Sequence, residues 1–454
     1  MKATNNLTFN LIISAVIGFA LIFTACSPQM PTQSNSSANT INTQTVNINS
    51  NVNNTAPTVK KNSVNLPVTL PVLDAMFYDE SFTAELKSNV GLSDEEIEKL
   101  KTASGEAVAN LGEDDENTRS TRAATKRAED QIRGILGEEK ANKLFELVSN
   151  RWAAGATGAE TASASAPNSI PTDTRIVVNA PAYRMDVFQD GKLTKTYKIG
   201  IGYPEFPLPQ GLRKADTIIF NPTWTPPDEP WVKGKVKPGQ KVEAGSKLNP
   251  LGPIKIPIGL PSLIHGGKQP ARLGTFASHG CVGLTNEQVK DFSMILAKIS
   301  GTQISDEDLK TYEKEKDKTK NVELAKTIPV ELRYETIIVE NGKLKIYRDV
   351  YEHGTNTDEN LRKVLEVYGV SFESLAETDR QKILDALKMM NTDADGKMIT
   401  ETAKSNSNSA NTEKDKKNDG KVTRNIKGQK EIEIILPQLL GKGYPVPLAP
   451  KTGV

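Results

Sequence analysis

The chain has 454 residues, a length that suggests about three domains at the usual 150 residues each. Its 57 basic and 56 acidic residues nearly cancel, so charge gives no reason to expect binding to nucleic acid or to an anionic membrane surface. Aromatic residues make up only 6%, and Asn, Ser and Thr are abundant near the termini, so part of the chain should be unfolded linker.

The first 26 residues combine a basic start with a short apolar run. Lys2 precedes an apolar stretch from Leu11 to Phe23, and small residues then lead to Cys26. A run of about 13 residues is too short for a comfortable transmembrane helix and fits a signal peptide. The cysteine at the cleavage position resembles a bacterial lipobox, although Phe23 stands where leucine is usual. An ordinary signal peptide or a short anchor helix is the alternative interpretation.

We therefore expect residues 1–26 to be a lipoprotein signal peptide and Cys26 to carry lipid. The lipid would hold the protein to a membrane of the cell envelope, outside the cytoplasm and on the periplasmic face in a Gram-negative cell. Cysteine usage agrees with this, because the chain has only one other cysteine, Cys281. An exported protein that keeps one free thiol needs a reason to do so, since that compartment oxidises thiols.

The next segments read as linker, helix and linker. Residues 27–66 are rich in Asn, Ser and Thr and should form a disordered tether. Residues 67–152 show helical periodicity, with Ser93 and Glu96 forming a capping box ahead of one apolar stripe. Residues 153–171 are rich in Ala, Gly, Ser and Thr and should be a second linker.

Residues 172–354 change to the period of a β-strand and should form a mostly-β domain. Tyr183, Met185 and Val187 alternate with polar residues, and Asp190-Gly191 predicts a hairpin turn. A helix is expected at 286–300.

A second hairpin is expected at 336–347, turning at Asn341-Gly342. Residues 355–400 have helical patterns, and 401–454 should be a charged linker with a short apolar tail. The predicted fold class is a multidomain chain in which a mostly-β domain is flanked by α-helical segments and disordered linkers.

The residues that indicate chemistry gather in one place. The chain has three histidines, and two of them, His265 and His279, lie within sixteen residues of Cys281. A free cysteine is only a few per cent thiolate at neutral pH, so a nearby imidazole would activate it by pairing with the thiolate or by taking its proton. If His265 stabilises the thiolate, the pKa of Cys281 should lie below that of a free thiol.

The glycines around these residues should bring the backbone close to a substrate. Gly266 follows His265, and Gly280 precedes Cys281. Backbone N–H groups of His279, Gly280 and Cys281 could converge on the oxygen of a tetrahedral intermediate. The alternatives are a buried structural cysteine or a partial zinc site, for which no fourth ligand is evident. We expect no metal.

These motifs resemble the L,D-transpeptidase family, the YkuD-type catalytic domain. His265 is followed sixteen residues later by the Cys of Ser278-His279-Gly280-Cys281. The other matching elements follow the order of the family: Pro207-Leu208-Pro209-Gln210-Gly211, Asn221-Pro222-Thr223-Trp224, Asn249-Pro250-Leu251-Gly252 and Arg348-Asp349-Val350-Tyr351. The resemblance covers 172–354 and leaves 67–152 and 355–454 unexplained.

The resemblance implies that Cys281 is a nucleophile and that His265 is the general base and acid, oriented by a backbone carbonyl such as that of Gly266. His279 would support the cysteine loop. The reaction would be acyl transfer between peptidoglycan stem peptides without a cofactor, through a thioester, with release of D-Ala. The remaining roles implied are backbone stabilisation of the oxyanion by Gly280 and Gly266 and substrate contact by Ser278 and Trp224.

One position departs from the family pattern, because Gly283 stands where Arg or Asn is usual two residues after the cysteine. Lys268 or Arg272 could supply the missing charge. The rival functions are a hydrolase of the same fold, using water as acceptor, and a peptidoglycan-binding lipoprotein with weakened activity. Residues 391–396 resemble half of a calcium loop but lack its closing glutamate, so a polar turn is the expected structure.

Overall fold

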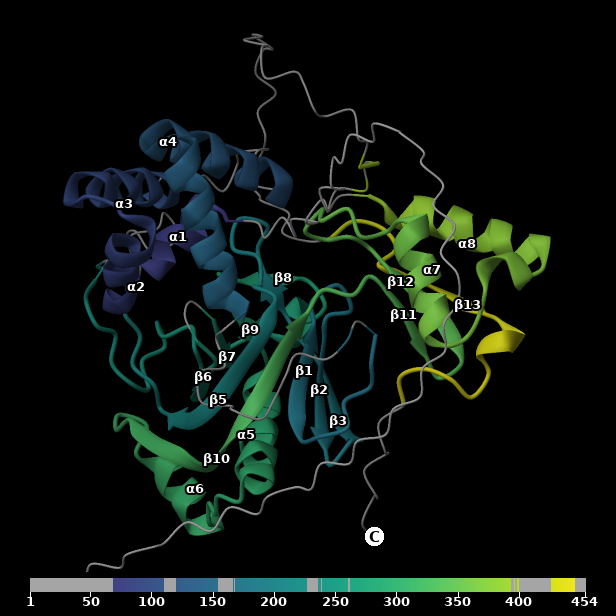
Figure 1. Ribbon diagram of the computed structural model, residues 1–454. Coiled ribbons are helices and arrows are strands. Elements are labelled where there is room, and N and C mark those ends of the chain that lie inside the picture. The colour runs from purple at the N-terminus through teal and green to yellow at the C-terminus, as the bar shows by residue number, and fades with distance from the viewer. Residues whose placement is uncertain are drawn as a thin grey trace, which may run out of the picture. The chain divides into compact units, whose positions relative to one another are not determined.

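The computed structural model describes residues 68–109, 120–153, 166, 168–226, 236–237, 239–259, 262–392, 396, 398–399 and 426–445 (Figure 1). The expected signal peptide with Cys26, the tether, and most of the second linker and of 401–454 lie outside these residues. No helix within the described ranges is long and apolar enough to cross a membrane.

Helices occupy the first described segment. Their bounds are α1 Leu70–Met76, α2 Glu80–Glu85, the π-helical turn η1 Leu86–Val90, α3 Asp94–Ala109 and α4 Thr121–Ala153. The capping box starts α3, because Ser93 N–H donates to Glu96 at 2.8 Å and Glu96 N–H donates back to Ser93 Oγ at 3.2 Å. Gly137, with φ of +72°, bends α4 where a side chain would be strained.

The buried faces of these helices form a core of their own. Ile97 and Leu100 of α3 pack with Leu144 and Val148 of α4. The buried positions of α3 follow the helical period of 3.6 residues and also include Ser104 and Val108.

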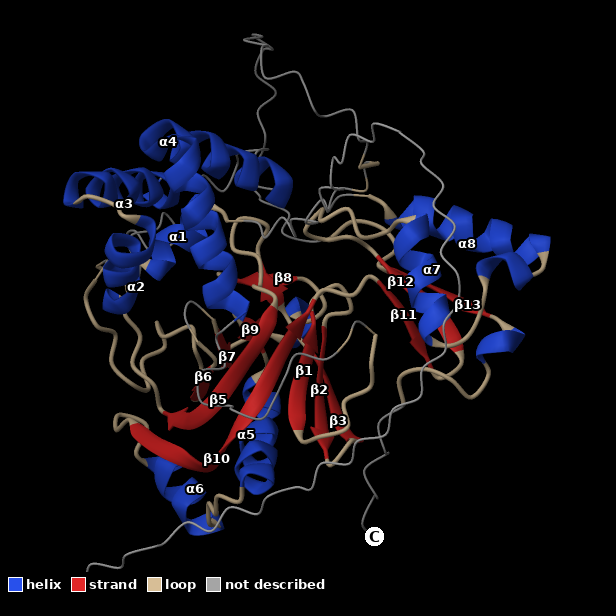
Figure 2. Cartoon of the chain, viewed as in Figure 1, coloured by secondary structure: helices blue, strands red, loops and turns tan. Residues whose placement is uncertain are grey.

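The β domain that follows is built on one large sheet (Figure 2). Its strands run in the order β3-β2-β1-β10-β5-β6-β7-β9, and β4 and β8 form a separate parallel pair. The bounds are β1 Arg175–Asn179, β2 Arg184–Gln189, β3 Lys192–Lys198, β4 Ile201–Gly202, β5 Gly211–Phe220, β6 Ile254–Pro257, β7 Leu263–His265, β8 Phe276–Ser278, β9 Val282–Gly283 and β10 Lys320–Arg333.

Two helices accompany this sheet, α5 Asn286–Ser300 and α6 Asp306–Lys314. The expected helix at 286–300 is confirmed, and Thr285 with Gln288 closes a capping box at its start. Phe292 of α5 packs edge-to-face on Tyr197 of β3, with ring centroids 5.8 Å apart. The short helix η3, Pro270–Arg272, precedes β8.

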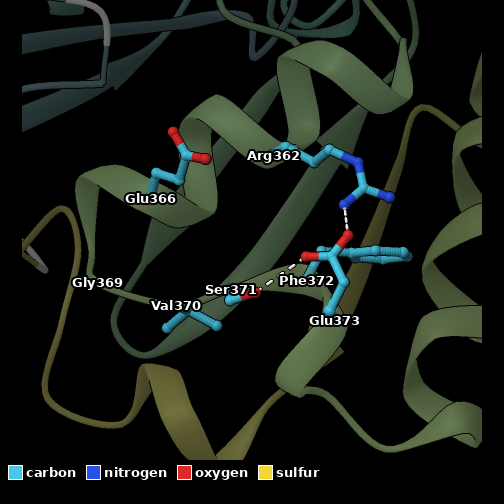
Figure 3. Close-up of a pocket in the computed structure, with 7 residues that line it drawn as sticks. All are labelled: Arg362, Glu366, Gly369, Val370, Ser371, Phe372 and Glu373. Carbon is cyan, nitrogen blue, oxygen red and sulfur yellow. Dashed lines mark hydrogen bonds and ion pairs between the residues drawn. The ribbon is translucent and has the colours of Figure 1, made fainter.

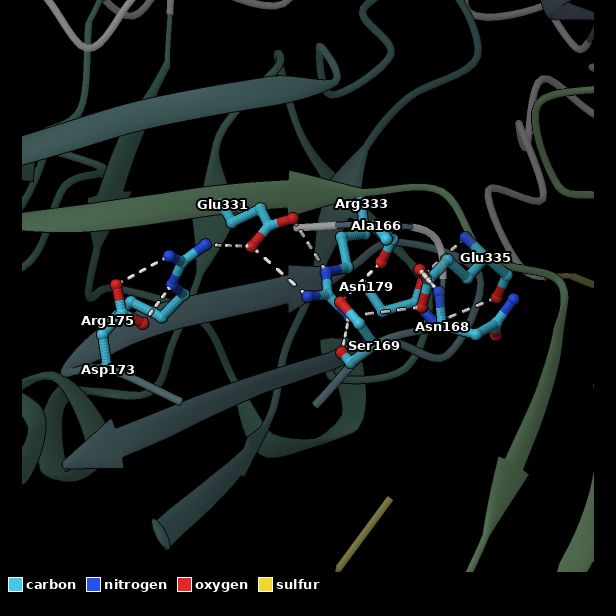
Figure 4. Close-up of polar contacts among 9 residues, drawn as sticks. All are labelled: Ala166, Asn168, Ser169, Asp173, Arg175, Asn179, Glu331, Arg333 and Glu335. Atoms are coloured by element: carbon cyan, nitrogen blue, oxygen red, sulfur yellow. Dashed lines mark hydrogen bonds and ion pairs between the residues drawn. The ribbon is translucent and has the colours of Figure 1, made fainter. Parts of the chain in front are cut away.

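A buried chain of charges joins the parallel neighbours β1 and β10 (Figure 4). Glu331 accepts from Arg175 Nη1 at 2.8 Å and from Arg333 Nη2 at 3.3 Å. Asp173 holds the other side of the Arg175 guanidinium at 2.5 and 2.6 Å, and this contact holds the pKa of Asp173 below its usual range. Each buried charge therefore has an opposite partner, as burial requires.

The C-terminal module combines a three-stranded sheet with two helices. Its elements are β11 Ile337–Glu340, β12 Lys343–Tyr347, α7 Asp358–Val367, η4 Phe372–Ser374, α8 Glu377–Met390, β13 Glu431–Ile435 and η6 Pro437–Leu439. The hairpin expected at 336–347 forms, but β12 pairs with β13 and the hairpin side chains join the core of this module. The mostly-β domain flanked by helical segments confirms the expected fold class.

The module also explains why β2 is buried on both faces. Met185 and Val187 point into the core of the β domain, as the alternation predicts. On the other face Arg184 is ion-paired with Asp186 and with Glu340 of β11. The polar residues of β2 are therefore covered by chain that lies far away in sequence.

Candidate active site

The sheet brings His265 and Cys281 onto one face. Strands β7 and β9 are parallel, with Ile264 opposite Val282 and His265 opposite Gly283. Side chains of paired residues point to the same face, and Ile264 and Val282 are both fully buried in the core. His265 follows Ile264 in β7, and Cys281 comes directly before Val282, the first residue of β9, so the alternation turns both away from this core face.

This register sets the backbone positions of His265 and Cys281. Neighbouring strands lie about 4.8 Å apart and two residues span about 6.6 Å, so the two Cα atoms are about 8 Å apart diagonally. The positive charges of Lys268 and Lys255 act on both His265 and Cys281, so the two groups share one neighbourhood. The strands thus bring two of the residues singled out in the sequence to nearby positions, from sixteen residues apart.

The loop before Cys281 is a tight turn closed by Ser278. The Ser278 hydroxyl donates to the carbonyl of Cys281 at 2.5 Å and accepts from the amide of Cys281 at 3.1 Å. Gly280 has φ of +83°, a conformation that favours glycine, and its carbonyl accepts from Ser262 Oγ at 2.8 Å. The turn presents Cys281 half-buried directly before β9.

Three expectations about this loop need correction. The Cys281 amide is not a free donor to an oxyanion, because Ser278 accepts from it. The Ser278 hydroxyl is buried in that turn, so it braces the loop where we had expected it to contact substrate. The Gly266 amide donates to Ile254 at 3.2 Å and is likewise occupied. Among the described residues no acceptor is recorded for the amide of Gly280, which keeps the oxyanion role available to it.

The carbonyl of Gly266 does orient His265. It lies 2.7 Å from Nδ1, and since a carbonyl only accepts, Nδ1 carries the proton and Nε2 is the basic nitrogen. Burial lowers the pKa of His265 to about 3, aided by the positive charges of Lys268 and Lys255 and opposed by hydrogen bonds to the carbonyls of Gly266 and Leu251. The imidazole is therefore neutral at physiological pH.

Burial also raises the pKa of the Cys281 thiol, against a backbone hydrogen bond from Leu263 and the charges of Lys268 and Lys255, which lower it. The expectation of a lowered thiol pKa is therefore wrong for the substrate-free site. A neutral imidazole supplies no charge to hold a thiolate, so the resting pair is thiol and imidazole. His265 is placed to take the proton when attack occurs.

His279 packs between two aromatic rings. The centroids of Tyr203 and Phe206 lie 5.0 and 4.9 Å from that of the imidazole, both edge-to-face. The Tyr203 amide also donates to the Ser278 carbonyl at 2.8 Å. These contacts make His279 a brace between the cysteine loop and the 203–206 loop.

The Tyr351 hydroxyl hydrogen-bonds to the backbone on either side of the 203–206 loop. Its hydroxyl donates to Gly202 O at 2.9 Å and accepts from the Leu208 amide at 3.3 Å. The Tyr351 amide donates to the hydroxyl of Tyr334 at 2.8 Å, which in turn donates to Asp349. In the sequence, Tyr351 is only the last residue of a matching motif. Its hydroxyl contacts backbone about 150 residues earlier in the chain, and no local pattern predicts such a contact.

Helices α1 and α4 also touch this loop. Thr69 Oγ1 donates to the carbonyl of Glu205 at 2.6 Å, and Thr121 Oγ1 donates to that of Pro204 at 2.8 Å. Thr69, just before α1, and Thr121, the first residue of α4, thereby hold the backbone of the loop that contacts His279.

Two lysines flank the thiol. Lys255 of β6 lies opposite His265 in the antiparallel register. Lys268 runs over Gly283, so that a Cβ atom added at Gly283 would lie 2.8 Å from Lys268 Cγ. Arg272 donates to the carbonyl of Phe276 at 3.0 Å instead. Of the two candidates for the missing charge, Lys268 and Arg272, it is Lys268 that lies beside Gly283. The sequence analysis did not identify Lys255, because a lone lysine in a short strand belongs to no motif.

The remaining sequence candidates lie elsewhere. Trp224 follows β5 on a loop where its amide donates to Val242 at 3.0 Å, and its contact with substrate remains a prediction. Within the described ranges no group of three or more His, Cys, Asp or Glu side chains could hold a metal ion.

Two cavities are lined by residues other than Cys281. One of about 860 Å³ opens beside Gly252, Gly267 and the helices α5 and α6. Another of about 310 Å³ lies in the C-terminal module (Figure 3). There Arg362 pairs with Glu373 and lies over the Phe372 ring, so its charges already satisfy one another.

The match to a family model falls on the β domain. Residues 173–303 match the family model of the L,D-transpeptidase catalytic domain, YkuD. A Bacillus subtilis (strain 168) protein named "Putative L,D-transpeptidase YqjB" is 24% identical over 152 residues, covering 32% of this chain and 73% of that protein.

Solved structures of similar proteins include the catalytic domain from the E. faecium L,D-transpeptidase, determined by NMR. It is 19% identical with a TM-score of 0.24, and the match covers 36% of this chain and 100% of that one. An L,D-transpeptidase from Mycobacterium smegmatis is 16% identical with a TM-score of 0.23, covering 35% of this chain and 58% of that one.

Proposed function

Because residues 173–303 belong to the L,D-transpeptidase catalytic domain family, we propose that this chain is a cysteine-dependent L,D-transpeptidase acting on peptidoglycan stem peptides. The observation that supports the proposal is the register of β7 and β9, which brings His265, a neutral imidazole, and Cys281 to nearby positions. Nucleophilic catalysis by a thiol needs a nearby base, and we assign that role to Nε2 of His265 because Nδ1 bonds to the Gly266 carbonyl.

The first step acylates the cysteine. The Cys281 proton moves to His265 Nε2 as Sγ attacks the carbonyl carbon between the third stem residue and D-Ala. The Gly280 amide faces the oxyanion that forms, and collapse of the tetrahedral intermediate breaks the C–N bond. D-Ala leaves with the proton from His265, and a thioester remains on Sγ.

The second step transfers the acyl group to an amine. The amine of a second stem attacks the thioester carbonyl and gives a proton to His265 as it does so. Breakage of the C–S bond then returns that proton to Sγ. The product is a 3→3 cross-link or an attachment to another amine, and no cofactor takes part.

A mass experiment tests this proposal. The full-length mature protein is incubated with a stem tetrapeptide, and intact mass is followed with and without an amine acceptor. We expect loss of D-Ala with the acyl group retained on Cys281, and transfer of that group when the amine is added. Cys281→Ala should show neither event.

The two rival functions predict other masses. A hydrolase of this fold would release D-Ala, but its acyl-enzyme would decay to tripeptide whether or not the amine is present. A peptidoglycan-binding lipoprotein without activity would retain the tetrapeptide noncovalently and leave its mass unchanged. Either result would replace the transfer mechanism.

For localisation we propose attachment through Cys26, with the catalytic domain in the cell envelope outside the cytoplasm. The proposal rests on the apolar run that ends at Cys26. Cys26→Ser should abolish lipid labelling and cleavage at this site. A mature protein whose first residue is not Cys26 would contradict it.

A further inference from the structure

Gly283 and Lys268 share one space beside the thiol. A Cβ atom built at Gly283 would lie 2.8 Å from Lys268 Cγ and 2.9 Å from Lys268 Cε, closer than real Cβ contacts come. The absence of a side chain at Gly283 is what admits the lysine stem. The space beside Gly283 therefore holds one side chain, that of Lys268.

The backbone fixes this arrangement. The Lys268 amide donates to the Leu284 carbonyl at 3.0 Å, just past the end of β9. The preceding amide, that of Gly267, donates to Asn286 Oδ1 at 2.8 Å. These two hydrogen bonds hold the backbone of Lys268 beside β9. The backbone therefore helps to direct the lysine side chain over Gly283.

The positive charges of two partly buried lysines consequently act on the thiol. Lys268 and Lys255 both favour the Cys281 thiolate, Lys268 more strongly. Burial lowers the pKa of Lys268 to about 8 and also lowers that of Lys255. Among the residues that the structure describes, no ion pair is recorded for either ammonium, so a bound anion would supply the missing opposite charge.

The substrate of the proposed reaction carries an anion at the required place. When D-Ala is the last stem residue, its carboxylate carbon lies only three bonds, about 3–4 Å, from the carbonyl carbon that Sγ attacks. We infer that Lys268, with Lys255 beside it, binds this carboxylate and selects acyl donors whose scissile bond adjoins a free carboxylate. The inference rests on the proposed function for the identity of the donor, but the cation site itself can be tested without it.

A pair of matched reagents tests the cation site. Iodoacetate and iodoacetamide alkylate the same thiolate and differ by one carboxylate, so the ratio of their rates cancels any change in the thiol pKa. We expect this ratio at Cys281 to exceed the ratio measured for glutathione by about tenfold, the effect of one charge-assisted hydrogen bond. Lys268→Met should bring the ratio down to that of glutathione, and Lys268→Arg should preserve it.

The control is Lys298→Met, which removes an exposed lysine near the end of α5 and should leave the ratio unchanged. Lys255→Met should lower the ratio less than Lys268→Met does. A ratio that stays high in a folded Lys268→Met protein would overturn the inference, whether or not the protein transfers acyl groups.

A second experiment tests the selectivity on substrate. The acylation rate is compared for a stem tetrapeptide and for the same peptide with a C-terminal amide. We expect the wild-type protein to favour the free acid and Lys268→Met to lose most of that preference, mainly through KM. The double variant Lys268→Ala with Gly283→Lys should recover it, because the cation returns from the other position.

The outcomes separate the two proposals. No acylation by either peptide, together with a high iodoacetate ratio, would refute the proposed reaction and leave the anion site standing. Equal rates with the acid and the amide in the wild-type protein would refute the selectivity while leaving acyl transfer intact.

Discussion

Replacing His265 distinguishes a neutral catalytic pair from an ion pair. An imidazolium about 4 Å from the thiolate would stabilise it by about 4 kcal/mol at an effective dielectric constant of 20, or about three pKa units. With the pKa of His265 lowered to about 3, only about one ring in ten thousand is protonated at pH 7, so this stabilisation is absent. His265→Ala should therefore leave the Cys281 pKa nearly unchanged.

The direction of any small shift in the Cys281 pKa of His265→Ala can also be predicted. Burial raises the pKa of Cys281, and removal of the ring would admit water, so the pKa should move down. Loss of an imidazolium would instead move it up. Acylation by the stem tetrapeptide at pH 7 should still fall by about two to four decades, because the base that takes the thiol proton is gone.

The assay is the rate of iodoacetamide alkylation of Cys281 as a function of pH. We expect the wild-type protein to show its inflection above the free-thiol value of about 8.5. The control is His353→Asn, which removes the third imidazole, half-buried against Tyr334, and thermal unfolding is followed to measure any loss of stability separately. A wild-type inflection below about 7 that rises by two units or more in His265→Ala would refute the neutral pair.

Three further predictions concern the supports of the site. Ser278→Ala should slow acylation about tenfold, measured by intact mass, because the hydroxyl that closes the Cys281 turn is lost. Tyr351→Phe should lower the free energy of unfolding by about 1–3 kcal/mol in urea titration, since Gly202 O and the Leu208 amide lose their partner; no change would mean that the 203–206 loop is held by other contacts. Glu331→Gln should cost about 1–3 kcal/mol in the same titration, because two buried guanidinium groups lose their shared carboxylate but keep Asp173 and Glu335 as partners; a loss below about 0.5 kcal/mol would show that those two carboxylates neutralise them without Glu331.

Local patterns in the sequence were enough for much of the fold. The capping box at Ser93, the turn at Asp190-Gly191 and the helix at 286–300 depend on contacts within a few residues, and the structure contains each of them. The candidate pair of His265 and Cys281 was also readable, because rare residues of complementary chemistry cluster within sixteen positions. Its catalytic role stays a prediction.

Charge states and distant partners could not be read in the same way. The pKa values of Cys281 and His265 depend on how deeply the folded chain buries them, and the motif alone suggested the wrong direction for the thiol. The sequence pattern placed the hairpin at 336–347 in the β domain. In the structure β13, about 90 residues later, pairs with it and makes it part of the C-terminal module. The sequence determined which residues can react and which short elements form, since both follow from side-chain chemistry and local geometry. Only the tertiary structure decided that Lys268 fills the space left by Gly283, because that contact depends on the register of two strands and the path of the loop between them.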